Sequence, residues 1–125
     1  MPLKHGQKSA NPPPADELQA FKAQFFRALA HPTRIRLLEM LARSGRSVQE
    51  LQAALTLDQP IVSQQLAVLR HQGIVLAQKE GSSVRYTLRD PLVGELLDVA
   101  RRIFDNRLTS TGGLLRELRR EVRRS

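Results

Sequence analysis

The spacing of the apolar residues changes near residue 74, and this change limits the folds open to the chain. Before that point apolar residues recur every three or four positions, as in Leu18, Phe21, Phe25 and Leu29, which is the pattern of one helix face. They then run in two short stretches, and in the second they alternate with polar residues, which is typical of a half-buried strand. Helical spacing returns afterwards. These patterns predict a mainly α fold with one small β-hairpin.

Capping and turn residues divide the helical part into separate helices. Ser47 and Glu50 form the pattern of a capping box. Asp58, followed by Pro60, is typical of a helix start, and Gly73 stands where a helix ends. Two helices joined by a tight turn and followed by a basic-tipped hairpin make the winged helix-turn-helix arrangement. In this arrangement the second helix enters the major groove of DNA, about 12 Å wide, and the hairpin wing reaches nearby phosphates or the minor groove.

The outward face of the fourth predicted helix carries uncharged polar side chains at its N-terminal end. Gln59, Ser63 and Gln64 cluster there, with Gln65 beside them. Glutamine can pair bidentately with adenine, and serine can bond to several base edges. A merely solvated face would usually carry Glu and Lys, so we interpret this face as a base-reading surface. Arg70 lies farther along and is expected to contact either a phosphate or a nearby carboxylate.

The last long helix, which begins after Asp90 and Pro91, is predicted to have two apolar stripes. Together the stripes are wider than one small core requires, so the spare one is expected to face a second subunit. They consist of Leu92, Leu96, Val99 and Ile103, and of Val93, Leu97, Ala100, Phe104 and Leu108.

The 125 residues suffice for one domain, and much of their positive charge lies toward the two ends. Lys and Arg number 20 against 12 Asp and Glu, a formal net charge of +8. This charge favours a nucleic acid as partner and leaves an acidic protein or an anionic membrane surface open. We expect residues 1–14 to be a flexible arm, 15–108 the winged domain and 109–125 a basic C-terminal extension. The arginines of the extension are either a solvated helix end or phosphate contacts: Arg116, Arg119, Arg120, Arg123 and Arg124.

Missing residue types exclude several kinds of chemistry. The chain has no cysteine, which excludes disulfides, thiolate metal sites and thiol redox sensing. His5, His31 and His71 lie in separate segments, so no metal site is predicted. There is no glycine-rich phosphate loop and no histidine beside a serine nucleophile, so we expect neither an enzyme nor a cofactor. No apolar run approaches the roughly 18 residues of a membrane span, and no secretory signal is visible, so we expect a cytoplasmic protein without a membrane partner.

The segments LAHPTRIRLLEML, VSQQLAVLRHQGIV and KEGSSVRYTL, taken together, resemble the ArsR/SmtB family of bacterial transcriptional regulators. The resemblance covers roughly residues 18–105. It implies a homodimeric winged-helix repressor that binds double-stranded DNA at an inverted-repeat operator, with the first and last helices forming the dimer.

The resemblance also implies roles for individual residues. In the turn, Thr56 stands where the family often has glycine, and Pro60 stands where it often has serine or threonine. The base-reading candidates are Gln59, Pro60, Ser63 and Gln64. The wing candidates are Lys79, Ser82, Ser83 and Arg85. The dimer candidates are Phe21, Phe25, Val93, Leu97, Ala100 and Phe104.

Many members of that family sense metals through cysteines near the third helix or through Asp/His pairs on the last helix. Here the last-helix pattern would begin at Asp98, but Ala100 follows two positions on and Thr111 stands where a histidine is needed. We therefore expect a member that senses neither metals nor thiol chemistry, and whose effector is unknown.

Two other functions fit parts of the sequence. One is a winged-helix module that binds proteins, against which the uncharged reading face and the basic wing argue. The other is a non-specific DNA-binding protein driven by its arginine-rich end. A steep salt dependence with little sequence preference would mark that case.

Overall fold

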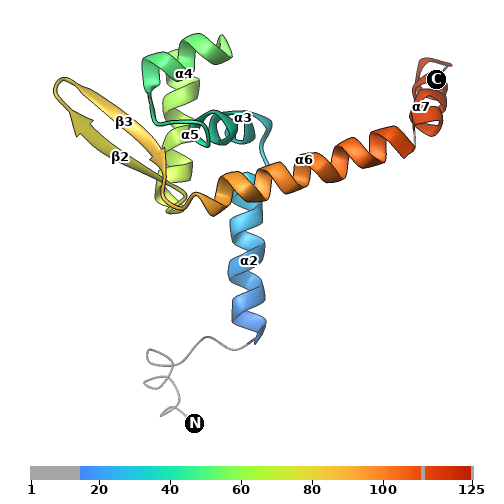
Figure 1. Ribbon diagram of the computed structural model, residues 1–125, viewed down its shortest axis with the longest axis horizontal. Coiled ribbons are helices and arrows are strands. Elements are labelled where there is room, and N and C mark those ends of the chain that lie inside the picture. The colour runs from blue at the N-terminus through green and yellow to red at the C-terminus, as the bar shows by residue number, and fades with distance from the viewer. Residues whose placement is uncertain (1–14, 111, 125) are drawn as a thin grey trace.

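The structure is a computed structural model that describes residues 15–110 and 112–124, and it is mainly helical with one small antiparallel sheet (Figure 1). This confirms the predicted fold class, while the predicted arm at residues 1–14 lies outside the described residues. In chain order the elements are α2 (Ala15–Leu29), α3 (Pro32–Leu41), β1 (Arg46–Ser47), α4 (Val48–Leu55), α5 (Gln59–His71), β2 (Val75–Glu80), β3 (Ser83–Leu88), α6 (Leu92–Ser110) and α7 (Gly112–Arg124).

The caps that begin the helices follow the sequence pattern, with one difference. Ser47 and Glu50 form the predicted capping box: the Glu50 N–H donates to Ser47 Oγ at 3.2 Å, and the Ser47 N–H donates to Glu50 Oε1 at 2.9 Å. Asp58 stands at the N-cap of α5, but its side chain makes no cap hydrogen bond. His31 caps α3, because its Nδ1 accepts a 3.1 Å hydrogen bond from the Thr33 N–H.

The turn between α4 and α5 is made by Thr56 in the left-handed conformation, with φ 55° and ψ 50°. The Leu57 N–H donates to the Gln52 carbonyl oxygen at 3.2 Å and closes the turn. Positive φ is unusual for a β-branched residue. The predicted tight turn therefore forms although Thr56 stands where the family that the sequence resembles often has glycine.

Leucines from three helices form the centre of the core and hold α5 in place. Leu37 and Leu38 of α3, Leu51 of α4, and Leu66 and Leu69 of α5 have no exposed surface. No polar or charged side chain is buried among the described residues. Complete burial of a leucine contributes roughly 1.5–3 kcal/mol to the free energy of folding. Burial of this cluster is therefore the main interaction that fixes α5 against α3 and α4.

The sheet has three strands in the order β1-β3-β2, although the sequence predicted only a hairpin. β2 and β3 form that hairpin around Gly81, which has a φ of 60°. β1 pairs with β3 and joins Arg46 to Tyr86 and Ser47 to Arg85. A strand of two residues has no periodicity, so the local pattern carried no signal for it. The added strand fastens the base of the wing to the start of α4.

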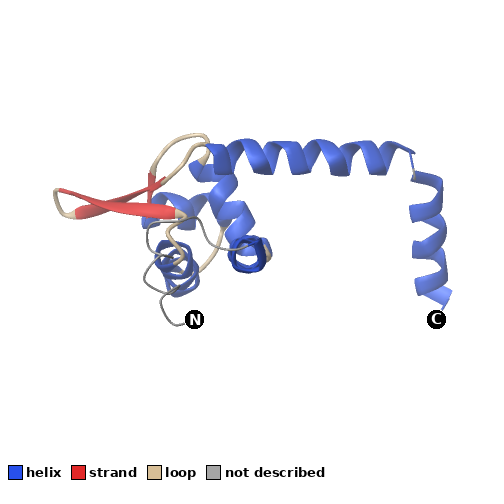
Figure 2. Cartoon of the chain, turned by 90° about the horizontal axis from the view of Figure 1, so that it is seen from below, coloured by secondary structure: helices blue, strands red, loops and turns tan. Residues whose placement is uncertain are grey.

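Three helices extend from the core or lie beyond it. α2 and α6 project away from the winged part (Figure 1), and α7 turns off at the far end of α6 (Figure 2). The sequence predicted that the winged domain ends at residue 108 and that a basic extension follows it. Instead, α6 continues to Ser110 and α7 is a helix of 13 residues. Among the residues that the structure describes, no helix combines the length and the apolar character that crossing a membrane requires.

Candidate nucleic-acid interface

α5 presents a buried face to the core and an exposed face near its N-terminus. Val62 and Leu66 have no exposed surface, whereas Gln59, Pro60 and Gln64 are exposed. The fold therefore gathers these predicted base-reading residues at the N-terminal end of α5. The free backbone N–H groups of a helix N-terminus also attract phosphate.

The polar side chains of α5 differ in their hydrogen bonds. Gln59 Nε2 donates to Ser63 Oγ at 2.8 Å. Gln64 makes no side-chain hydrogen bond within the described part of the chain. Gln65 differs, because it is half-buried and its Oε1 accepts a 2.9 Å hydrogen bond from Arg34 Nη1. Gln65 thus ties α5 to α3 and is less exposed than Gln64.

Ile61 also belongs to the exposed end of α5, although the sequence analysis passed over it. Its side chain is 40% exposed. An apolar side chain in this position can contact the methyl group of thymine. An apolar residue at this position could equally have been buried. The orientation of α5 on the core shows that it is exposed.

A hollow lies between the outward face of α5 and the wing. It is lined by Ser63, Ala67, Arg70, His71 and Tyr86. Arg70 is exposed and makes no ion pair with a carboxylate of the described residues, which favours the phosphate alternative. Ala67 and Tyr86 were missed from sequence, because the hollow depends on how α5 meets β3.

The wing places its predicted contact residues at two depths. Lys79, Ser82 and Ser83 are exposed toward the tip of the hairpin. Arg85 is half-buried at the base, where a Cβ atom on Gly45 would lie 2.7 Å from its Nε. Gly45 must therefore be glycine for this arginine to lie across it.

Glu50 lies close enough to this arginine to respond to its charge. Hydrogen bonds from the Ser47 backbone and hydroxyl are the main causes that lower the pKa of Glu50, and burial opposes them. The positive charges of Arg46 and Arg85 lower it further. The charge of Arg85 thus acts partly on a carboxylate of its own chain.

The predicted dimer residues divide between the core and the free surface. Val93 is 8% exposed and belongs to the monomer's own core, on which Phe25 and Leu97 pack half-buried. Ala100 is also half-buried. Phe21 and Phe104 are each 61% exposed and remain free for a partner.

Both apolar stripes of α6 contribute to its free surface. Near its start α6 crosses α3 closely, since a Cβ on Gly94 would lie 2.9 Å from the Ala42 Cβ. Beyond that crossing the helix leaves the core, and both faces become exposed. The stripe without predicted dimer residues supplies Val99 and Ile103 beyond the crossing, which are 44% and 54% exposed, and Leu92 before it, which is 63% exposed.

An uncharged helix face, held from behind by buried leucines and flanked by a β wing, defines a winged helix-turn-helix protein of the DNA-binding kind. The model of the family described as "Bacterial regulatory protein, arsR family" matches residues 31–76, which run from the cap of α3 into β2. The chain belongs to the ArsR family. This confirms the resemblance carried by the three sequence segments.

Individual relatives agree with this assignment. The HTH-type transcriptional regulator Rv0081 of Mycobacterium tuberculosis is 42% identical over 106 residues, or 84% of this chain and 93% of that protein. The biofilm growth-associated repressor of Agrobacterium fabrum is 40% identical over 94 residues, or 74% of this chain and 80% of that protein.

Solved structures show the same fold. The crystal structure of Rv0081 superimposes with a TM-score of 0.69 and 44% identity, covering 74% of this chain and 94% of that one. The homodimeric winged helix-turn-helix DNA-binding domain Mb0332 of Mycobacterium bovis gives a TM-score of 0.68 at 27% identity, covering 74% and 86%.

Proposed function

We propose that this chain is a transcriptional repressor that binds an inverted-repeat operator as a homodimer and has no enzymatic activity. The observation that carries the proposal is the exposed, uncharged N-terminal end of α5 on a rigid leucine core. Its relatives include a repressor from Agrobacterium fabrum, and its structural neighbour Mb0332 is homodimeric. Two copies of one reading helix, related by two-fold symmetry, match an operator with two-fold symmetry.

The proposed contacts separate base reading from phosphate binding. Gln59, Ser63 and Gln64 bond to base edges in the major groove, and Pro60 and Ile61 give this end of α5 an apolar surface for thymine methyl groups. Phosphate and sugar contacts carry affinity without sequence information. The residues proposed for them are Arg70 on α5 and Lys79, Ser82 and Ser83 on the wing.

The proposal includes no metal-sensing or thiol-sensing step. The sequence contains no cysteine, so thiolate ligands and thiol oxidation are both excluded. The pattern that resembles a last-helix metal site has Ala100 in place of a ligand. Regulation must therefore use another kind of signal.

Gln64→Ala is expected to weaken binding to the operator by roughly 1–3 kcal/mol, because one bidentate base contact is lost. Fluorescence anisotropy with DNA from the chain's own upstream region, and with a shuffled duplex of equal composition, measures the change. Gln72→Ala is the matched control, since Gln72 is exposed at the opposite end of α5. An equal loss on both duplexes would show that Gln64 reads no base.

Lys79→Ala is expected to weaken binding to operator and shuffled DNA alike, because it removes a phosphate contact. The slope of log K against log salt should fall by about 1 in magnitude for each protomer of the dimer. Arg85→Ala is the matched control and should change the slope less, because its guanidinium lies across Gly45 at the base of the wing. A larger slope change for Arg85→Ala than for Lys79→Ala would reverse this assignment.

A further inference from the structure

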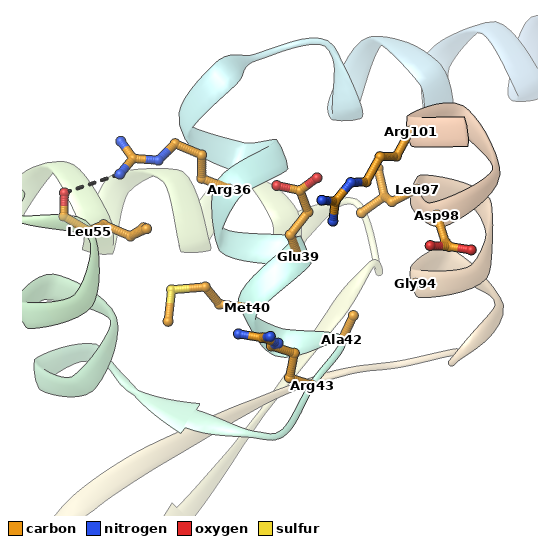
Figure 3. A pocket seen from close by; sticks show the side chains of 10 residues that line it. All are labelled: Arg36, Glu39, Met40, Ala42, Arg43, Leu55, Gly94, Leu97, Asp98 and Arg101. Carbon is orange, nitrogen blue, oxygen red and sulfur yellow. Dashed lines mark hydrogen bonds between the residues drawn. The ribbon is translucent and has the colours of Figure 1, made fainter. Parts of the chain in front are cut away.

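A hollow of about 680 Å³ opens between α3, the end of α4 and α6 (Figure 3). None of its lining residues belongs to the proposed reading surface. The hollow lies beside the point where the segment after α3 meets α6 closely, at Ala42 and Gly94. Sites for small molecules typically have volumes of roughly 300–1,000 Å³, so this one is large enough for a small organic ligand.

The hollow combines an apolar lining with arginine side chains. Met40 of α3, Leu55 of α4 and Leu97 of α6 supply the apolar part. Methionine adapts its shape to irregular partners, which suits it to the wall of a ligand site. Arg43, just after α3, and Arg101 of α6 come from opposite sides of the hollow (Figure 3).

These two arginines have unused hydrogen-bonding capacity. Neither makes a side-chain hydrogen bond or an ion pair with any residue that the structure describes. Glu39 and Arg101 point toward one another across the hollow, but form no ion pair (Figure 3). Asp98 is engaged outside the lining, because its Oδ2 lies 3.4 Å from Arg102 Nε. The donors of Arg43 and Arg101 are therefore free to bind a ligand.

The charges of the lining indicate which ligand would fit. A third arginine, Arg36, already donates from Nη2 to the Leu55 carbonyl oxygen at 3.4 Å. Three guanidinium groups face the carboxylate of Glu39, since that of Asp98 is paired with Arg102, so the lining has an excess of positive charge and favours an anion. One carboxylate placed between Arg43 and Arg101 can accept from both, and the carboxylate of Glu39 disfavours a ligand with further negative charge. Guanidinium groups match the planar geometry of a carboxylate.

We propose that this hollow binds a small organic monocarboxylate whose apolar body lies against Met40, Leu55 and Leu97, and that its occupancy changes the affinity for DNA. The second claim, that occupancy changes the affinity for DNA, is the regulatory half of the proposal and rests on the proposed function. α3 is hydrogen-bonded to α5 through Arg34 and Gln65. α6 carries the exposed apolar surface proposed for the dimer. A ligand held between α3 and α6 therefore acts on the angle between the reading helix and the dimer helix, which sets the spacing of the two reading helices.

The binding half is tested without DNA, by isothermal titration calorimetry of the full chain. The probes are phenylacetate and octanoate, with phenylacetamide and inorganic phosphate for comparison. We expect saturable binding of a carboxylate at one site per chain, and none of the neutral amide. Arg43→Gln and Arg101→Gln should each weaken it about tenfold, since each loses a charge-assisted hydrogen bond. Arg107→Gln, on the same helix but outside the lining, should leave it unchanged.

Binding that is unaffected by Arg43→Gln and Arg101→Gln, or equal binding of the amide, would overturn the site. The absence of saturable binding by either carboxylate would overturn the ligand class. The regulatory half is tested by repeating the anisotropy titration with the bound carboxylate present. An unchanged DNA affinity would overturn the coupling while leaving the proposed function intact. A chain that binds the carboxylate but no DNA would overturn the proposed function while leaving the site intact.

Discussion

Phe104→Glu is expected to convert the proposed dimer into a monomer and to abolish binding to the full operator. Phe104 is 61% exposed in one chain and lies on α6 beside Ile103, which is 54% exposed. A carboxylate placed in a paired apolar surface is buried without a partner, which costs several kcal/mol. We expect the dimer dissociation constant to rise at least about 100-fold, or ~3 kcal/mol. Sedimentation velocity at micromolar concentration measures the change.

Ala53→Glu is the control for this experiment. It adds the same charge at an exposed position of α4, away from α2 and α6. The control should remain a dimer, and each variant should keep the helical circular dichroism of the parent. A Phe104→Glu chain that still sediments as a dimer would place the interface elsewhere. Leu97→Glu is a poorer test, since Leu97 also packs on the monomer's own core.

Leu66→Ala is expected to lower the free energy of unfolding by roughly 2–5 kcal/mol, because it leaves a cavity behind the reading helix. Leu66 has no exposed surface and lies in the cluster that joins α5 to α3 and α4. Small domains have total stabilities of about 5–15 kcal/mol, so the loss is a large fraction of the whole. Urea denaturation at a fixed protein concentration measures it, since a dimer's stability depends on concentration.

Ile61→Ala provides the comparison on the same helix. Ile61 is 40% exposed, so its truncation removes less buried surface and leaves little cavity. We expect a loss of less than about 1 kcal/mol for this variant. Equal losses for Leu66→Ala and Ile61→Ala would mean that α5 is held by something other than its leucine face.

Local sequence patterns were enough to predict the fold class and the starts of α4, α5 and α6. The capping box of Ser47 and Glu50 involves residues three apart, and the hairpin strands show their alternation within a few positions. The uncharged end of α5 was also visible, because Gln59 and Ser63 lie one helical turn apart. Such features depend on neighbours along the chain, so they can be recognised without a three-dimensional structure.

Contacts between residues far apart in the sequence decided which side chains are engaged within the chain. Gln65 looked like its neighbour Gln64 in the sequence, yet only Gln65 accepts a hydrogen bond from Arg34, 31 positions away. Arg85 looked like the other wing residues, yet it is half-buried where its side chain lies close to Gly45.

The same reasoning applies to α6 and to the hollow beside it. Both stripes of α6 have helical spacing, and only the crossing at Ala42 and Gly94 determines where its surface becomes free. The two arginines proposed to bind the ligand, Arg43 and Arg101, come from the segment after α3 and from α6, which are far apart in the chain. Periodicity and capping therefore determined the elements of this protein. Tertiary packing determined which side chains remain free to bind, because burial and hydrogen bonding depend on the neighbours that folding brings together.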